Sequence, residues 1–219
     1  ARWGHGAALV ADVNGDRYIT IVGGKSDATT GYLASLEYAA VDDATGLIAA
    51  PTVSGSTPLP AGRAFFGLGI ETTETVSAYG DGTRLFVIGG VDISGAVFDL
   101  VSTEVSTGGG NEAPVSHTVM GQSGPIAGPQ CVITGDKLFV VGGGSVASDT
   151  AVSSVTDTAR DMPFDSVDGS IDPPMQSAAN ALTSGDRALG AAVIGSGFIY
   201  FIGGSSDGTD ALATTEKTF

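Results

Sequence analysis

The chain has 219 residues and a formal net charge of −15, from 24 acidic and 9 basic residues. Such a surface repels phosphate groups, so we expect neither nucleic acid nor an anionic membrane surface as a partner. Glycine contributes 34 residues and hydrophobic residues make up 42 % of the chain, which favours an all-β protein with many tight turns over collagen or disorder. No apolar run approaches the ~20 residues of a membrane helix.

The first 40 residues contain a unit of three predicted strands. Arg2 precedes a small-residue apolar segment at 6–10, and Asn14-Gly15-Asp16 is a hairpin signal. An apolar, β-branched run at 18–22 then ends in Gly23-Gly24, and a third strand is predicted at 35–38. Because the run is short and continuously apolar, it indicates a strand that is buried on both faces.

The same order of elements recurs three more times along the chain, with the third strands predicted at 102–105, 154–157 and 214–217. The later glycine pairs are Gly89-Gly90, Gly142-Gly143 and Gly203-Gly204. Arg63 and Arg187 precede the first strands of the second and fourth units, whereas the third has Gln130 where the register predicts arginine. This periodicity predicts one domain of four repeats, at about 1–61, 62–128, 129–185 and 186–219.

The arrangement resembles the kelch repeat, in which an arginine-led strand is followed by an apolar strand ending in Gly-Gly and then by two outer strands. Residues 58–63 (Pro-Leu-Pro-Ala-Gly-Arg) are similar to the link between kelch blades. The resemblance covers essentially the whole chain and implies an all-β fold, a β-propeller of four kelch-like blades. The tryptophan usual in the fourth kelch strand is missing, because the only tryptophan is Trp3 in a first strand.

The last repeat stops at Phe219, so the fourth blade is predicted to lack its outer strand. An unpaired strand edge exposes backbone donors and acceptors, which predicts self-association or a protein partner at that edge. Three arrangements fit: a fragment of a longer propeller, a four-bladed ring with a three-stranded last blade, and a half-ring completed by a second copy.

One candidate metal site lies in the first hairpin, where Asp12, Asn14 and Asp16 alternate along a glycine-bearing turn. Residues 11–18 are similar to the calcium loop of the FG-GAP (integrin-type) propeller repeat, and the alternative is a plain hairpin turn. No other cofactor is predicted. His5 is predicted to be a packed or surface residue. His117 lies in a segment of alternating apolar residues at 115–119 that is typical of an outer strand, and it is predicted to be exposed. No catalytic residue is assigned.

The repeated arginines and glycine pairs are predicted to be structural, with the arginines making ion pairs or carbonyl contacts between blades; the alternative is a ligand role in the central channel. We therefore expect a non-catalytic module for protein interaction or assembly, with the loops after the glycine pairs as one variable face. The alternatives are a carbohydrate-binding or sugar-modifying kelch enzyme and a structural subunit of an extracellular filament or sheath. A chain that begins at Ala1 without methionine fits processing, and hence a secreted or cell-surface protein.

Overall fold

The computed structural model describes residues 2–26, 31–72, 83–117, 126–148, 151–165, 171, 176–177, 182, 188–207 and 210–218. Over these residues the protein is all-β, with strands and turns but no helix, as the composition predicts. Accordingly, the same part of the chain contains no helix long and apolar enough to cross a membrane.

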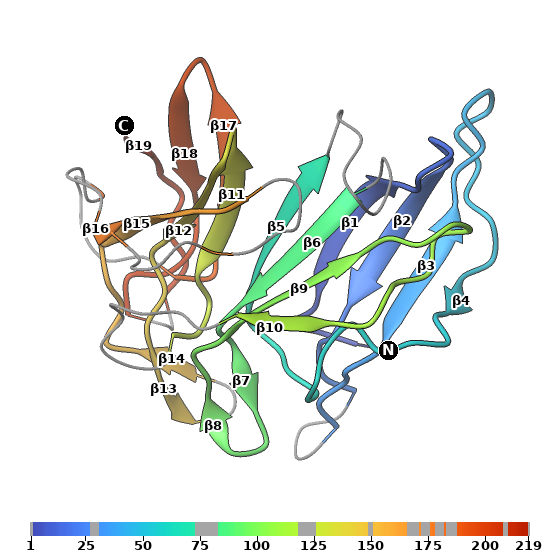
Figure 1. The fold of residues 1–219 in the computed structure, drawn as a ribbon. Coiled ribbons are helices and arrows are strands. Elements are labelled where there is room, and N and C mark those ends of the chain that lie inside the picture. The colour runs from blue at the N-terminus through green and yellow to red at the C-terminus, as the bar shows by residue number, and fades with distance from the viewer. Residues whose placement is uncertain are drawn as a thin grey trace.

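Four antiparallel sheets follow one another along the chain, and in each of them the paired strands are in sequence order (Figure 1). The first sheet contains β1 (Gly6–Ala11), β2 (Arg17–Val22), β3 (Leu36–Ala40) and β4 (Thr52–Val53). The second contains β5 (Gly67–Thr72), β6 (Thr83–Ile88), β9 (Leu100–Glu104) and β10 (Val115–His117). The third contains β11 (Gln130–Thr134), β12 (Lys137–Val141), β15 (Ala159–Pro163) and β16 (Gln176–Ser177). The fourth contains β17 (Ala191–Gly195), β18 (Phe198–Ile202) and β19 (Thr215–Thr218).

Two small hairpins follow the second and third glycine pairs. They are formed by β7 (Val91–Asp92) with β8 (Gly95–Ala96), and by β13 (Ser145–Ser148) with β14 (Ala151–Ser153). The second of these hairpins displaces the third strand of its repeat. The prediction of a strand at 154–157 was wrong, because the strand that pairs with β12 is β15, which begins at Ala159.

The sheets stack face to face in chain order. Their first strands are adjacent, since β1 contacts β5, β5 contacts β11 and β11 contacts β17. Apolar side chains fill each space between sheets: Val10 and Leu85 between the first and second, Phe86 and Leu138 between the second and third, and Phe201 with its neighbours between the third and fourth. The four sheets lie within the four predicted repeats.

The strand β6 shows how this stacking uses an apolar run. All six of its residues are buried, so the prediction of a strand buried on both faces is confirmed for β6. It was wrong for β2 and β18, in which alternate residues are only partly buried or exposed. Leu85 and Val87 pack towards the first sheet, whereas Phe86 and Ile88 pack towards the third. Alternate side chains of one strand therefore contribute to two different cores.

Glycines allow the first strands to approach closely. A Cβ on Gly69 of β5 would lie 2.9 Å from Leu138 Cδ1 and 3.0 Å from Cys131 Sγ. Cys131 is buried in this contact, and burial raises the pKa of its thiol. The cysteine is therefore an inert packing residue of the second interface between sheets.

Candidate functional site

The glycine pairs are turns that need glycine. All eight residues have positive φ, from 59° to 105°. The first glycine of each pair donates its N–H to the carbonyl just before the third strand of its own sheet: Gly23 to Ser35, Gly89 to Asp99, Gly142 to Thr158 and Gly203 to Thr214. The second glycine can reach the next sheet, as Gly24 donates to Arg63 O and Gly90 to Ile126 O. The glycine pairs therefore connect each second strand to its own sheet and, for the first two pairs among the residues that the structure describes, to the next sheet.

The repeated arginines make contacts within one sheet. Arg2 donates to Gly23 O at 2.8 Å and pairs with the Glu37 carboxylate. Arg63 pairs in the same way with Asp99, donating from Nη2 to Oδ2 at 2.9 Å. The expected contacts between blades were misplaced, because each side chain lies across the ends of the second and third strands of its own sheet. Arg187 lies outside the described residues.

The third repeat has isoleucine at the arginine position. Ala64, which follows Arg63, pairs with Val91, and Ala127 pairs with Gly144 in the same way. The equivalent of Arg63 is therefore Ile126. The prediction of Gln130 at this position was wrong by four residues, since Gln130 begins β11 as Gly67 begins β5.

Two residues after each arginine position, the backbone has positive φ in all four repeats: Gly4, Phe65, Gly128 and Leu189. These residues form a hydrogen-bonded series from sheet to sheet. Phe65 N–H donates to Gly4 O at 2.8 Å, Gly128 N–H to Phe65 O at 2.7 Å, and Leu189 N–H to Gly128 O at 2.9 Å. This series lies just before the first strands. Its hydrogen bonds stabilise the strained, positive φ of Phe65 and Leu189.

The predicted metal site is a turn in which Asp12 contacts backbone groups. Asp12 Oδ1 accepts hydrogen bonds from the N–H groups of Asn14 and Asp16, at 2.9 and 3.1 Å. Its Oδ2 accepts one from Gly108 N–H of the second sheet at 2.9 Å. Burial alone would raise the pKa of Asp12, but the hydrogen bonds from Gly108, Asn14 and Asp16 outweigh it and hold the pKa below its ordinary value.

Asn14 and Asp16 themselves are exposed. Within the described part of the chain, no three His, Cys, Asp or Glu side chains are grouped to hold a metal ion. The geometry assigns Asp12 to the turn and to a link between the first two sheets, and a calcium ion there stays a prediction.

The loops after the glycine pairs include both hairpins, which lie on the same side of the molecule (Figure 1). Lys25, which directly follows the first pair, is fully buried, and its Nζ lies 4.5 Å from the centre of the Tyr32 ring and 5.6 Å from that of Trp3. Part of the predicted variable face is therefore a packed structure.

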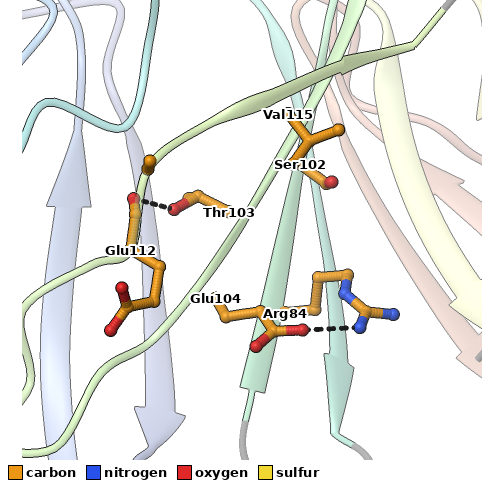
Figure 2. Close-up of a pocket in the computed structure, with 7 residues that line it drawn as sticks. Arg84, Ser102, Thr103, Glu104, Glu112 and Val115 are labelled. Carbon is orange, nitrogen blue, oxygen red and sulfur yellow. Dashed lines mark hydrogen bonds and ion pairs between the residues drawn. The ribbon is translucent and has the colours of Figure 1, made fainter. Parts of the chain in front are cut away.

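A cavity of about 350 Å³ lies on the second sheet, beside β9 and β10 (Figure 2). Arg84 of β6 is buried beside it and forms ion pairs with Glu71 at 3.2 Å and Glu104 at 2.6 Å. Burial raises the pKa of Glu71, although Arg84 partly opposes this rise. The cavity is lined by Arg84, Ser102, Thr103, Glu104, Glu112, Ala113 and Val115.

A serine and a histidine meet beside this cavity. Ser102 Oγ lies 2.7 Å from His117 Nε2. His117, which we expected to be exposed, is half-buried, whereas His5 is exposed. Sequence reasoning missed the pair because it depends on the register of β9 against β10, although the alternation around His117 indicated a strand.

The outward faces of the first and fourth sheets expose apolar side chains. On the first sheet, Leu9 is 54 % exposed, whereas the adjacent Val10, which faces the second sheet, is 2 % exposed. On the fourth sheet, Val193 is 48 % and Ile202 is 44 % exposed. We call these surfaces the end faces.

No protein-family model and no curated protein matches this sequence. Its fold is similar to that of a solved structure described as "Structure of YjhT", with a TM-score of 0.61 and 15 % sequence identity. The similarity covers 97 % of this chain and 64 % of that chain, so this chain spans less than two thirds of the length of that protein. At this identity, the likeness concerns the fold alone.

Proposed function

We propose that this chain forms four consecutive blades of a kelch-like β-propeller and acts as an assembly module through its end faces. Four meandering sheets that stack in chain order, with their first strands adjacent, are the arrangement that a propeller requires. The observation that carries the proposal is the exposure of Leu9, Val193 and Ile202 on faces that the inner sheets bury.

The two end faces are complementary halves of one repeated interface. Counting back from the glycine pairs, Ile19 and Ile21 of β2 are equivalent to Leu85 and Val87, which the second sheet packs against the first.

On the other end face, Tyr200 and Ile202 of β18 are equivalent to Phe86 and Ile88, which the second sheet packs against the third. Each end face therefore corresponds to a face that the second sheet buries against a neighbouring sheet. The end face of the fourth sheet is accordingly complementary to the end face of the first.

The structural likeness supports a ring with more than four sheets. Four sheets correspond to 64 % of the YjhT chain, or 16 % per sheet, so the other 36 % leaves room for about two more sheets. Two further sheets would belong to the same polypeptide, whereas a second copy of the chain would bring four sheets and make a ring of eight. A head-to-tail contact between copies either closes into a ring of fixed mass or continues as an open polymer. The filament alternative therefore predicts a larger mass in solution than a closed ring does.

The test is the solution mass by light scattering of the wild-type chain and of Leu9→Glu and Val193→Glu. If copies complete one another, the wild type is a dimer or larger, and each variant becomes a monomer because a charge enters an apolar contact. Leu47→Glu is the matched control, since Leu47 is 70 % exposed in the turn between β3 and β4.

A monomeric wild type that binds an apolar dye, with binding lost in Leu9→Glu and Val193→Glu, means that the covering sheets come from the same polypeptide. A monomer that binds no dye contradicts the proposal.

The geometry gives less support to a sugar-binding or sugar-modifying role. The residues that line the cavity on the second sheet include no aromatic ring on which a sugar could stack.

A further inference from the structure

The pairing of β9 with β10 holds Ser102 and His117 on one face of the second sheet. Ser102 is directly opposite Val115, and His117 is two residues further along the same strand. Side chains at such diagonal positions point the same way and are within reach of each other. The 2.7 Å contact between Ser102 Oγ and His117 Nε2 is the distance at which a base accepts the proton of a nucleophilic hydroxyl.

Ser102 is more shielded from solvent than a surface serine, which favours a reactive hydroxyl. Ser102 is 4 % exposed, yet its side chain lines the cavity (Figure 2). Its direct neighbour across the sheet on the other side is Phe86, a core residue of the interface with the third sheet. The hydroxyl therefore lies between an apolar core and the cavity, where electrostatic interactions are stronger than in bulk water.

We propose that Ser102 and His117 are a nucleophile and general-base pair that reacts with small acyl esters entering this cavity. Ser102 Oγ attacks the carbonyl carbon while His117 Nε2 takes the hydroxyl proton. The bond to the alcohol oxygen then breaks, and His117 returns the proton to the departing alkoxide, which leaves an acyl-Ser102 ester. Attack by water on this ester, with the same proton transfers, releases the acid and restores Ser102.

The charges around the cavity select among esters. Glu104 and Glu112 line the cavity, and Glu71 forms an ion pair with Arg84. Among these four side chains, three carboxylates outnumber one guanidinium. An anionic ester is repelled, and an uncharged or cationic one is accepted. The inference does not depend on the assembly role, because the cavity lies on a single inner sheet.

The experiment uses a dialkyl fluorophosphate, which is uncharged and adds a phosphoryl group to a reactive serine with loss of fluoride. Intact-mass and peptide mass spectrometry of the full chain should find one adduct, on Ser102. Ser102→Ala should abolish it, and His117→Gln should slow it about 100-fold or more, because general-base catalysis contributes on that order. Ser116→Ala is the matched control, since Ser116 is exposed on the neighbouring position of β10 and should label like wild type.

Two further readouts separate reactivity from folding. Labelling of the wild-type chain should fall as the pH is lowered, and this fall should be absent in a folded His117→Gln, which separates His117 from the carboxylates around the cavity. Hydrolysis of p-nitrophenyl acetate should show a burst that Ser102→Ala lacks, with the circular dichroism spectra of the variants matching the wild type. An unlabelled Ser102, a label spread over several serines, or equal rates in wild type and a folded His117→Gln would overturn the proposal.

Discussion

The strands β6 and β18 have closely similar apolar sequences and different environments. Every residue of β6 is buried, because the second sheet lies between the first and the third. In β18, Ile199 and Phe201 are buried against the third sheet, while Ile202 is 44 % exposed on the end face. In a stack of repeated sheets, the neighbouring sheets set the burial of a strand, and its own sequence only permits that burial.

The glycine pairs differ in the same way. Gly89 and Gly203 have nearly the same φ, 65° and 66°. A Cβ on Gly89 would lie 2.4 Å from the carbonyl oxygen of Ile126, where the chain enters the third sheet, whereas a Cβ on Gly203 would lie 3.4 Å from Leu212 O. Glycine is therefore required at position 89 for two reasons, its φ and the lack of space for a Cβ. At position 203 only the φ requires it.

The largest expected effect comes from Gly89→Ala. The left-handed φ costs roughly 1–2 kcal/mol for alanine, and the clash with Ile126 O adds about 1–3 kcal/mol, so the free energy of unfolding should fall by about 2–5 kcal/mol. Gly203→Ala should lose only the φ contribution, about 1–2 kcal/mol. Urea unfolding followed by circular dichroism measures both, and equal losses would show that the neighbouring sheet does not constrain this turn.

A similar range is expected for Ile88→Ala, which is compared with Ile202→Ala because both change the last residue of the second strand, in the second and fourth sheets. Ile88 is fully buried, so its truncation should lower the free energy of unfolding by about 2–5 kcal/mol. Ile202→Ala should cost less than about 1 kcal/mol in the isolated chain. If copies associate through the end faces, Ile202→Ala also weakens that association in light scattering, whereas a loss as large as that of Ile88→Ala would show that the fourth sheet is already covered.

Local patterns predicted most of the fold. The glycine pairs, the hairpin signals and the apolar runs located the second strands and their turns, because these features depend on neighbouring residues. The third strand of the third repeat was placed too early, since the hairpin β13–β14 occupies the residues that lead to it. The register error at Gln130 has a related cause, because the isoleucine that replaces arginine at position 126 carries no polar signal.

The candidate site was much harder to predict. The pairing of Ser102 with His117 depends on which residues of β9 and β10 are opposite each other after a turn of about ten residues. The contact of Asp12 with Gly108 joins residues 96 positions apart. Such contacts follow from the stacking of the sheets, and no local pattern of residues encodes them.

The smallest effect tests a polar link between two inner sheets, through Asp12→Asn. Asp12 is 3 % exposed and bonds the backbone of both the first and the second sheet, so the loss at neutral pH should be about 1–3 kcal/mol. Asp42→Asn is the matched control, because Asp42 caps only its own exposed turn, at Ala44 and Thr45, and should lose less.

The pKa of Asp12 determines how the stability difference between wild type and Asp12→Asn changes with pH. The pKa of Asp12 is lower in the folded protein than its ordinary value of 3.8, so its stabilising effect is fully present above that value and is lost as the pH falls through the folded-state pKa. The difference between wild type and Asp12→Asn should therefore shrink in acid. A chelator should leave the melting temperature unchanged if Asp12 bonds only groups of the protein, namely the backbone N–H groups and the Tyr18 hydroxyl. A fall in that temperature, present in wild type and absent in Asp12→Asn, would instead establish calcium in the first hairpin, because a bound ion stabilises only the chain that can hold it.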